Sequence, residues 1–206
     1  EFINNIKSSK IPAVVIDGST EDPDMSYVYI DYYGTTYSAV SYLYKLGHRR
    51  FCYMLPDERE ISCRQAIQRV NGYKDALKSL NLIDSGLYFN KNSVHEIIEL
   101  INSSSPEDRP SAVVVNKTSY AAYLLKAFAD HGIKIPDDIS VIACNDQNTA
   151  EFLTPSLTTV KVPTYTIGQK SADILFDILQ GKSLNIKLKL PNEVIERDSC
   201  KNLQVQ

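Results

Sequence analysis

The feature that most constrains the fold is the alternation of short, continuously apolar segments with amphipathic ones. Residues 111–115 read Ser-Ala-Val-Val-Val, as expected of a strand that is buried on both faces of a sheet. Residues 64–80 instead place their apolar side chains at helical spacing. Gly72 lies inside this helix, where glycine weakens a helix, so we expect packing to require a small residue there. The alternation predicts an α/β fold with parallel sheets covered by helices on both faces.

The same pattern continues along the chain. We expect further strands at residues 12–17, 27–31, 51–55, 140–143, 157–160 and 186–190. We expect further helices at residues 34–46, 94–101, 120–131 and 167–179. Binding residues of open α/β sheets gather in the loops at the carboxyl ends of the strands. The loops of interest therefore follow Asp17, Ile30, Leu55, Val115 and Ala143.

Composition and charge exclude several classes of protein. The chain has 22 basic and 25 acidic residues and a net charge of −3, which argues against this chain binding a phosphate backbone by itself. It contains no apolar run of about eighteen residues, so we expect no membrane span. The four cysteines have no zinc-type spacing, and the first residues do not form a signal-peptide pattern. These features predict a cytoplasmic protein with free thiols.

Motifs for catalysis, nucleotides and metals are missing or better explained otherwise. The eight glycines are at least thirteen residues apart, which excludes a GxGxxG loop, and Gly181-Lys182-Ser183 lacks the earlier P-loop glycine. His95 and Glu99 would share a helix face and could hold a metal weakly, but a solvated helix flank is the favoured interpretation. His48 could be a general base, or a histidine that bonds backbone at a strand entry, which we favour. We expect no catalytic residue, metal or cofactor.

Arg69 is the strongest candidate for ligand binding on chemical grounds. It lies on the 64–80 helix, close to a strand-end loop. Its guanidinium could offer a bidentate fork to ligand hydroxyls or to a carboxylate. Taken alone, a surface salt bridge is the favoured interpretation of this arginine.

Six stretches of the chain also carry a family resemblance through their order and spacing. They are Ile11–Asp17, Leu46–Arg50, Arg69–Leu77, Gly132–Ile142, Leu157–Val160 with Pro163, Gly168 and Ala172, and Leu190–Ser199. Together they span residues 11–199 and resemble the effector-binding core of the LacI/GalR family of bacterial transcription regulators.

The resemblance implies a periplasmic binding protein-like fold of type I. Such a fold has two doubly wound parallel-sheet subdomains, several hinge crossovers and a ligand in the cleft between the subdomains. We expect an N-terminal subdomain of residues 1–46 plus 161–180, and a C-terminal subdomain of residues 47–160 plus 181–206. The family's core has further elements before Ile11, preceded by a DNA-binding headpiece, so the N-terminal subdomain is expected to be incomplete here.

The resemblance also implies effector-binding residues. Arg69 matches the arginine that contacts effector in the family, and Gln65 lies one helical turn before it on the same face. Asp17 and Tyr29 fall where relatives sometimes contact ligand from the N-terminal side.

Two departures from the family concern charge. Asn145-Asp146 stands where the family usually has Asp-Asp, and Lys117-Thr118 follows the strand after which relatives commonly carry Asn-Asp. We expect Asn145, Asp146 and Lys117 to be effector-binding residues. One hypothesis is a more positive cleft that binds an acidic ligand such as a sugar acid or sugar phosphate. The alternative is that Lys117 points to solvent and Asn145 bonds a neutral sugar.

The sequence therefore predicts a non-enzymatic core that senses a sugar or sugar derivative and forms a homodimer. DNA would be bound only through a domain absent from this chain, and no membrane would be involved. A sugar-binding protein of an ABC transporter is the main alternative, because it shares the fold. A doubly wound enzyme is disfavoured, since no nucleophile, base or phosphate loop was found. A regulator whose headpiece belongs to another DNA-binding class remains open.

Overall fold

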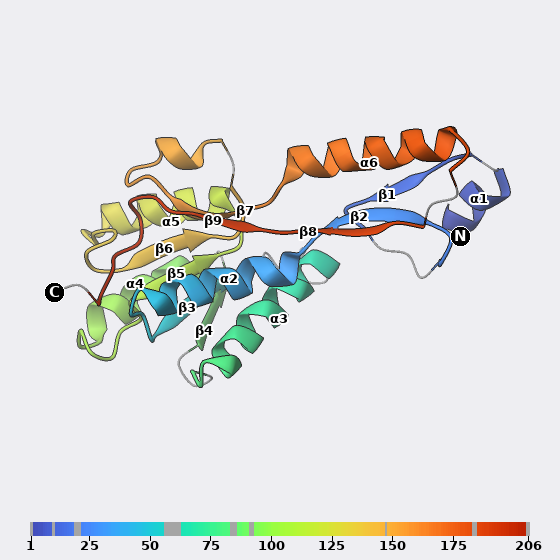
Figure 1. The fold of residues 1–206 in the computed structure, drawn as a ribbon. Helices are drawn as coiled ribbons and strands as arrows, with labels where there is room; N and C mark the ends of the chain where they lie inside the picture. Colours follow the sequence, from blue (N-terminus) through green and yellow to red (C-terminus); the bar gives the residue numbers. More distant parts are fainter. Residues whose placement is uncertain are drawn as a thin grey trace. The chain divides into compact units, whose positions relative to one another are not determined.

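The chain forms two compact units, each built around its own sheet (Figure 1). The computed structural model describes residues 2–9, 11–18, 22–55, 63–82, 86–90, 93–146, 148–182 and 185–204. Unit 1 comprises Glu1–Asp31 and Pro163–Asn192, and unit 2 comprises Tyr32–Val162 and Glu193–Gln206. Each unit is described by itself.

Unit 1 has a three-stranded, wholly parallel sheet in the order β1-β2-β8. Its strands are β1 (Val14–Ile16), β2 (Ser26–Ile30) and β8 (Lys187–Leu190). The helix α6 (Thr164–Leu179) packs against β1 and β2, and α1 (Phe2–Ser9) precedes the sheet in the chain. The central strand β2 thus pairs with residues that follow it by about 160 positions in the sequence.

Unit 2 has a six-stranded sheet in the order β4-β3-β5-β6-β7-β9, in which only β9 is antiparallel to its neighbour. Its strands are β3 (Phe51–Leu55), β4 (Gly86–Asn90), β5 (Ala112–Val115), β6 (Ser140–Ala143), β7 (Thr158–Lys161) and β9 (Glu193–Ile195). Its helices are α2 (Tyr32–Lys45), α3 (Arg64–Ser79), α4 (Val94–Ser103) and α5 (Thr118–Asp130), with a short 3-10 turn at Ala150–Phe152.

The sheet of unit 2 separates two apolar cores. Val113 and Val115 pack into the core that contains α4 and α5, whereas Val114 packs into the core that contains α2 and α3. All four residues of β5 are buried, because successive side chains point to opposite covered faces. This three-layer arrangement confirms the predicted α/β fold. It also confirms that the uninterrupted apolar run at residues 111–115 forms a strand buried on both faces of the sheet.

Every helix and strand expected from the sequence is present within a few residues of its expected bounds. The sequence did not predict α1, β4 or β9. No helix in the described ranges is long and apolar enough to cross a bilayer.

The compact units divide the chain at other points than the expected subdomains. Residues 32–46 were expected with the N-terminal part, but α2 packs against α3 and therefore belongs to unit 2. Residues 187–190 were expected with the C-terminal part, but β8 hydrogen-bonds to β2 in unit 1. The chain passes between units after Asp31, Val162 and Asn192, whereas the expected subdomains change after residues 46, 160 and 180.

A close contact between α2 and α3 explains the glycine in the middle of α3. A Cβ atom at Gly72 would lie 2.6 Å from Thr36 Oγ1 and would overlap the carbonyl oxygen of Tyr33. Thr36 also donates a hydrogen bond of 2.6 Å to the backbone carbonyl of Arg69, one turn before Gly72. The small residue thus allows α3 to approach α2, as the sequence suggested.

We predict that Gly72→Ala lowers the free energy of unfolding by about 3 kcal/mol, because backbone atoms of α2 must shift to admit the methyl group. Gly168→Ala in α6 is the matched control, since no atom lies within 4 Å of a Cβ there. The control should gain about 1 kcal/mol from helix propensity. Chemical denaturation of both variants tests this, and equal stability of Gly72→Ala and the wild type would contradict the packing.

His48 is a buried structural histidine, as favoured from the sequence, and not a general base. Its Nε2 lies 3.0 Å from the carbonyl oxygen of Lys201, and its Nδ1 lies 2.9 Å from Ser111 Oγ. A carbonyl can only accept, so Nε2 carries the proton and Nδ1 accepts from the hydroxyl. Burial lowers the pKa of His48 from 6.5 to about 4.

We predict that the stability of unit 2 falls as the pH drops from about 6.5 to about 4. The unfolded state takes up a proton on His48 in this window while the folded state resists it, which amounts to a loss of up to about 3 kcal/mol. Urea denaturation across this range measures the effect. In His48→Gln this part of the pH dependence should disappear, and an unchanged pH profile would refute the assignment.

Candidate functional site

A pocket of about 340 Å³ lies at the carboxyl edge of the unit 2 sheet. Its lining comes from the start of α2, the first turns of α3 and the loops that follow β5 and β6. The lining residues are Tyr32, Cys63, Gln65, Ala66, Arg69, Asn116, Lys117 and Asn145. Four residues expected from the sequence to bind effector, namely Gln65, Arg69, Lys117 and Asn145, are therefore brought together.

Arg69 is the most unusual group in the pocket, because its side chain is buried and has no acidic partner among the residues that the structure describes. The residue is only 7% exposed, and its Cζ lies 4.5 Å from the centre of the Tyr32 ring. Nη2 donates a long hydrogen bond of 3.4 Å to the carbonyl oxygen of Cys144. Within the described residues, Nε has no hydrogen-bond partner and no carboxylate forms an ion pair with the guanidinium. The salt-bridge alternative for Arg69 is thus not what the described residues show.

Asn116 adds an acceptor to the same pocket. It directly follows β5, is 2% exposed, and its Oδ1 has no partner among the described residues. A buried polar atom left without a hydrogen bond costs about 1–3 kcal/mol. The pocket therefore contains one hydrogen-bond donor, Arg69 Nε, and one acceptor, Asn116 Oδ1, that have no partner among the described residues. Such a pair suits a polar ligand.

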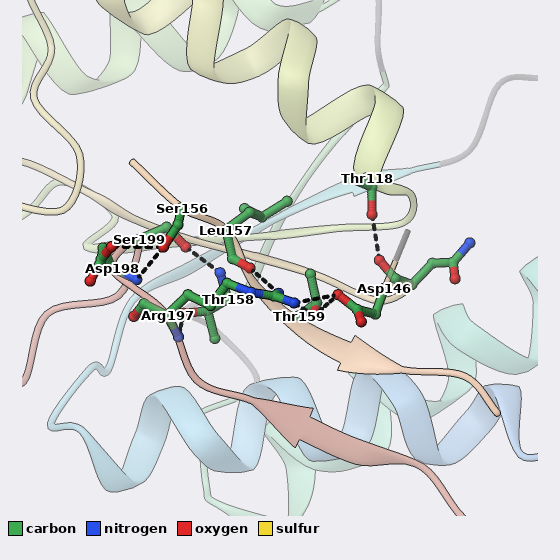
Figure 2. Close-up of polar contacts among 10 residues, drawn as sticks. Thr118, Asp146, Ser156, Leu157, Thr158, Thr159, Arg197, Asp198 and Ser199 are labelled. Carbon is green, nitrogen blue, oxygen red and sulfur yellow. Dashed lines mark hydrogen bonds and ion pairs between the residues drawn. The ribbon is translucent and has the colours of Figure 1, made fainter. Parts of the chain in front are cut away.

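The two strand-end loops are tied to one another next to the pocket. The hydroxyl of Thr118, at the start of α5, donates to the backbone carbonyl of Asn145 (Figure 2). Lys117 is half-buried, and its Nζ lies 5.6 Å from the centre of the Tyr120 ring. The Asn145 side chain and Lys117 thus stand on loops of fixed relative position.

Asp146 serves the framework of this site and is not among the pocket-lining residues. Its Oδ1 accepts a hydrogen bond of 2.7 Å from Thr159 and forms an ion pair of 3.1 Å with Arg197 Nη2 (Figure 2). Arg197 Nη1 also donates to the carbonyl of Leu157 at 2.6 Å and to Thr159 Oγ1 at 3.1 Å. These bonds fasten the loop after β6 to β7 and to the segment after β9.

Two candidate residues lie in unit 1. Asp17 follows β1 directly and adopts a left-handed conformation with φ of 54°, while its N–H donates to the carbonyl of Val28 at 2.8 Å. Tyr29 is half-buried on β2, with its ring centre 5.6 Å from that of Tyr27. Both stand near the carboxyl ends of parallel strands, at the edge of the sheet where binding residues are expected.

The described residues contain no cluster of three or more histidine, cysteine, aspartate or glutamate side chains that could hold a metal. The rings of His95 and His131 lie 6.1 Å apart in a T-shaped arrangement. Burial raises the pKa of the Cys144 thiol to about 12, although Arg69 opposes the shift. Cys63, by contrast, is an exposed thiol at the rim of the pocket.

Sequence reasoning missed four of the lining residues: Tyr32, Cys63, Ala66 and Asn116. Asn116 could have been predicted, because it is the first residue after a predicted strand, but the family resemblance pointed to the next two residues, Lys117 and Thr118. Tyr32 could not be found in this way, because it precedes the expected start of its helix and reaches the site only through the packing of α2 on α3.

Comparisons with known proteins agree on the family. Residues 40–200 match the family described as periplasmic binding protein-like domain. The NTD biosynthesis operon regulator NtdR of Bacillus subtilis is 29% identical over 197 residues, covering 91% of this chain and 58% of the relative. The HTH-type transcriptional repressor PurR of Vibrio atlanticus is 28% identical over 204 residues, covering 96% and 59%. Among solved structures, a LacI family regulator from Enterococcus faecium with bound ribose has a TM-score of 0.79 at 25% identity, covering 98% of this chain and 75% of that one.

These matches define a ligand-binding α/β domain of the periplasmic binding protein-like class. The chain belongs to that family, and the relatives reported above are transcription regulators, as the sequence indicated. It spans about three fifths of the length of the curated relatives it matches.

We predict an energetic coupling of about 1–3 kcal/mol between Asp146 and Arg197, since each side chain is only 17% exposed and the pair is hydrogen-bonded on both sides. Arg197→Met should destabilise the chain more in the wild type than in the Asp146→Asn background, because the single change leaves a carboxylate without its cation. A double-mutant cycle by chemical denaturation measures the coupling, and additive effects would contradict it.

Proposed function

We propose that this chain is the effector-binding core of a transcription regulator and that the unit 2 pocket binds the effector. The observation that carries the proposal is that two buried groups of one pocket, Arg69 Nε and Asn116 Oδ1, have no hydrogen-bond partner among the described residues. Buried polar groups are normally hydrogen-bonded, so two exceptions in one pocket call for an explanation, and a bound polar ligand supplies one.

The chemistry of the pocket suits a sugar or a sugar derivative. The guanidinium of Arg69 can donate to adjacent hydroxyls, while Asn116 Oδ1 can accept from one. The ring of Tyr32 offers an aromatic face beside them. A volume of about 340 Å³ is at the small end of ligand pockets, which fits a monosaccharide-sized molecule. Support also comes from the ribose-bound regulator whose fold this chain shares.

The remaining parts of the proposal follow from the relatives. We propose Asp17 and Tyr29 as effector contacts that unit 1 contributes, a homodimeric assembly, a cytoplasmic location and no catalytic activity. DNA contact is assigned to a part of the regulator other than this chain, because the chain has a net charge of −3. A transporter's sugar-binding protein has less support, since the relatives reported above are regulators.

Effector binding would act by selecting one arrangement of the regulator. A ligand shifts a conformational equilibrium only by its difference in affinity for the two states. Arg69 is suited to supply that difference, because Thr36 of α2 fixes its backbone while its Nε has no hydrogen-bond partner among the described residues. Whether binding favours or opposes DNA contact depends on the whole regulator.

We predict that at least one monosaccharide or close derivative raises the melting temperature of the chain by about 5 °C or more at a hundred times its Kd. Arg69→Gln should weaken that ligand about a hundredfold, as expected for the loss of a charged hydrogen-bond donor. Lys126→Gln is the matched control, because Lys126 is an exposed cation on α5 that pairs with Asp130.

The same ligand should change the affinity of the intact regulator for its operator DNA. Fluorescence anisotropy with and without the ligand measures this change. Equal stabilisation of the wild type and Arg69→Gln would show that the pocket is not the effector site. A stabilising ligand that leaves DNA affinity unchanged would contradict the regulatory role.

A further inference from the structure

We infer that the effector of the unit 2 pocket is an anion: a monosaccharide-sized polyol that carries a carboxylate or a phosphate. This inference rests on the proposed function, because it names the chemical class of ligand that the same pocket would bind. The two anionic groups share the chemistry that matters here, which is a negative charge with oxygen acceptors for a guanidinium fork.

The first argument is the unbalanced charge of Arg69. A buried ion is normally paired and fully hydrogen-bonded, because removing it from water is expensive. At 7% exposure, Arg69 has the Tyr32 ring and one long bond of 3.4 Å to a neutral carbonyl as its contacts among the described residues. Neither contact supplies a negative charge. A ligand anion would supply it and would also satisfy Nε.

The second argument is the identity of the residues around the guanidinium. Among the described residues, the pocket lining contains a second cation, Lys117, and includes no carboxylate. The loop after β6 presents the neutral amide of Asn145 to the pocket, while the adjacent carboxylate of Asp146 is held by Arg197 at 3.1 Å. The carboxylate of Asp146 is therefore paired with Arg197 and does not neutralise the charge of Arg69.

The third argument is that a neutral sugar would leave the electrostatic imbalance in place. Hydroxyl groups can satisfy the N–H donors of Arg69, but a neutral ligand brings no countercharge, and none of the described lining residues of the unit 2 pocket is acidic. Asp17, the carboxylate proposed from unit 1, would instead accept hydrogen bonds from hydroxyl groups of the polyol. An anionic group at the same place satisfies both the donors and the charge. The pocket of about 340 Å³ leaves room for a small polyol beside that group.

Matched pairs of compounds test the inference by calorimetry on the whole chain. The pairs are glucose with glucose 6-phosphate, and glucose with glucuronate, in which the pyranose ring is kept. We expect the anionic member of at least one pair to bind ten times or more tightly than its neutral partner, and the preference to shrink as salt rises. Arg69→Gln should abolish the preference, and the two pairs distinguish a phosphate from a carboxylate.

Asn145→Asp is the most informative variant, because it adds one carboxylate to the lining without changing side-chain size. It should weaken the anionic ligand tenfold or more and leave the neutral partner equal or stronger. Lys126→Gln, which removes a cation outside the lining, should change neither affinity. Neutral members that bind at least as tightly as the anions, in an Arg69-dependent manner, would overturn the inference and leave the proposed function standing.

Cys63 allows a second test that needs no ligand. It is the exposed thiol of the pocket rim, whereas Cys52 and Cys144 are buried. We expect a negatively charged methanethiosulfonate to react at Cys63 faster than a positively charged one, relative to a reference thiol made by Ser103→Cys in a Cys63→Ser background. Asn145→Asp and Arg69→Gln should each reduce the ratio severalfold. A ratio at Cys63 equal to the reference ratio would overturn the inference even if no compound of either pair binds.

Discussion

The close approach of α3 to α2 is the contact on which the candidate site depends. Gly72 removes the side chain that would separate the helices, and Thr36 then hydrogen-bonds the backbone carbonyl of Arg69 at 2.6 Å. The same approach places the Tyr32 ring 4.5 Å from the guanidinium carbon. Helix packing thus fixes the arginine from its backbone side, while its Nε has no hydrogen-bond partner among the described residues.

A second framework holds the opposite wall of the pocket. Asp146, Thr159 and Arg197 form a closed set of bonds that joins the loop after β6 to β7 and to the segment after β9 (Figure 2). Thr118 adds a bond from the start of α5 to the backbone of Asn145. Asp146 and Arg197 therefore neutralise each other within this framework. Arg69, in the pocket, has no acidic partner among the described residues. A binding site is preorganised when rigid bonds hold its ligand-contacting residues in place before the ligand binds.

The sequence predicted the elements of the fold well because local patterns decide them. The apolar run at β5 and the helical spacing of α3 each reflect how one element meets the core, and both were confirmed. The division into units was not predictable in this way. Whether β8 joins the sheet of β2 is decided by pairing across about 160 residues, which no local pattern records.

The site was predictable only in part, for a similar reason. Arg69 stood out because its helix and its family resemblance agreed, and the structure brings it together with Gln65, Lys117 and Asn145. Asp146 looked like a neighbouring ligand group, but its ion pair with Arg197 spans fifty-one positions and was invisible in the sequence. Charge balance in a pocket depends on which acids are already paired, so it could be judged only from the structure.

The central claim is that the Nε–H of Arg69, which has no hydrogen-bond partner among the described residues, donates a hydrogen bond to the effector. The ¹⁵N–¹H resonance of this group tests the claim most directly. The signal can be assigned by its loss in Arg69→Lys. The account predicts a large shift of this resonance when the effector saturates the chain, together with slower exchange of the Nε proton with water, because a new hydrogen bond forms there. A resonance that stays unchanged when the effector saturates the chain would contradict the claim that Arg69 Nε–H donates a hydrogen bond to the effector.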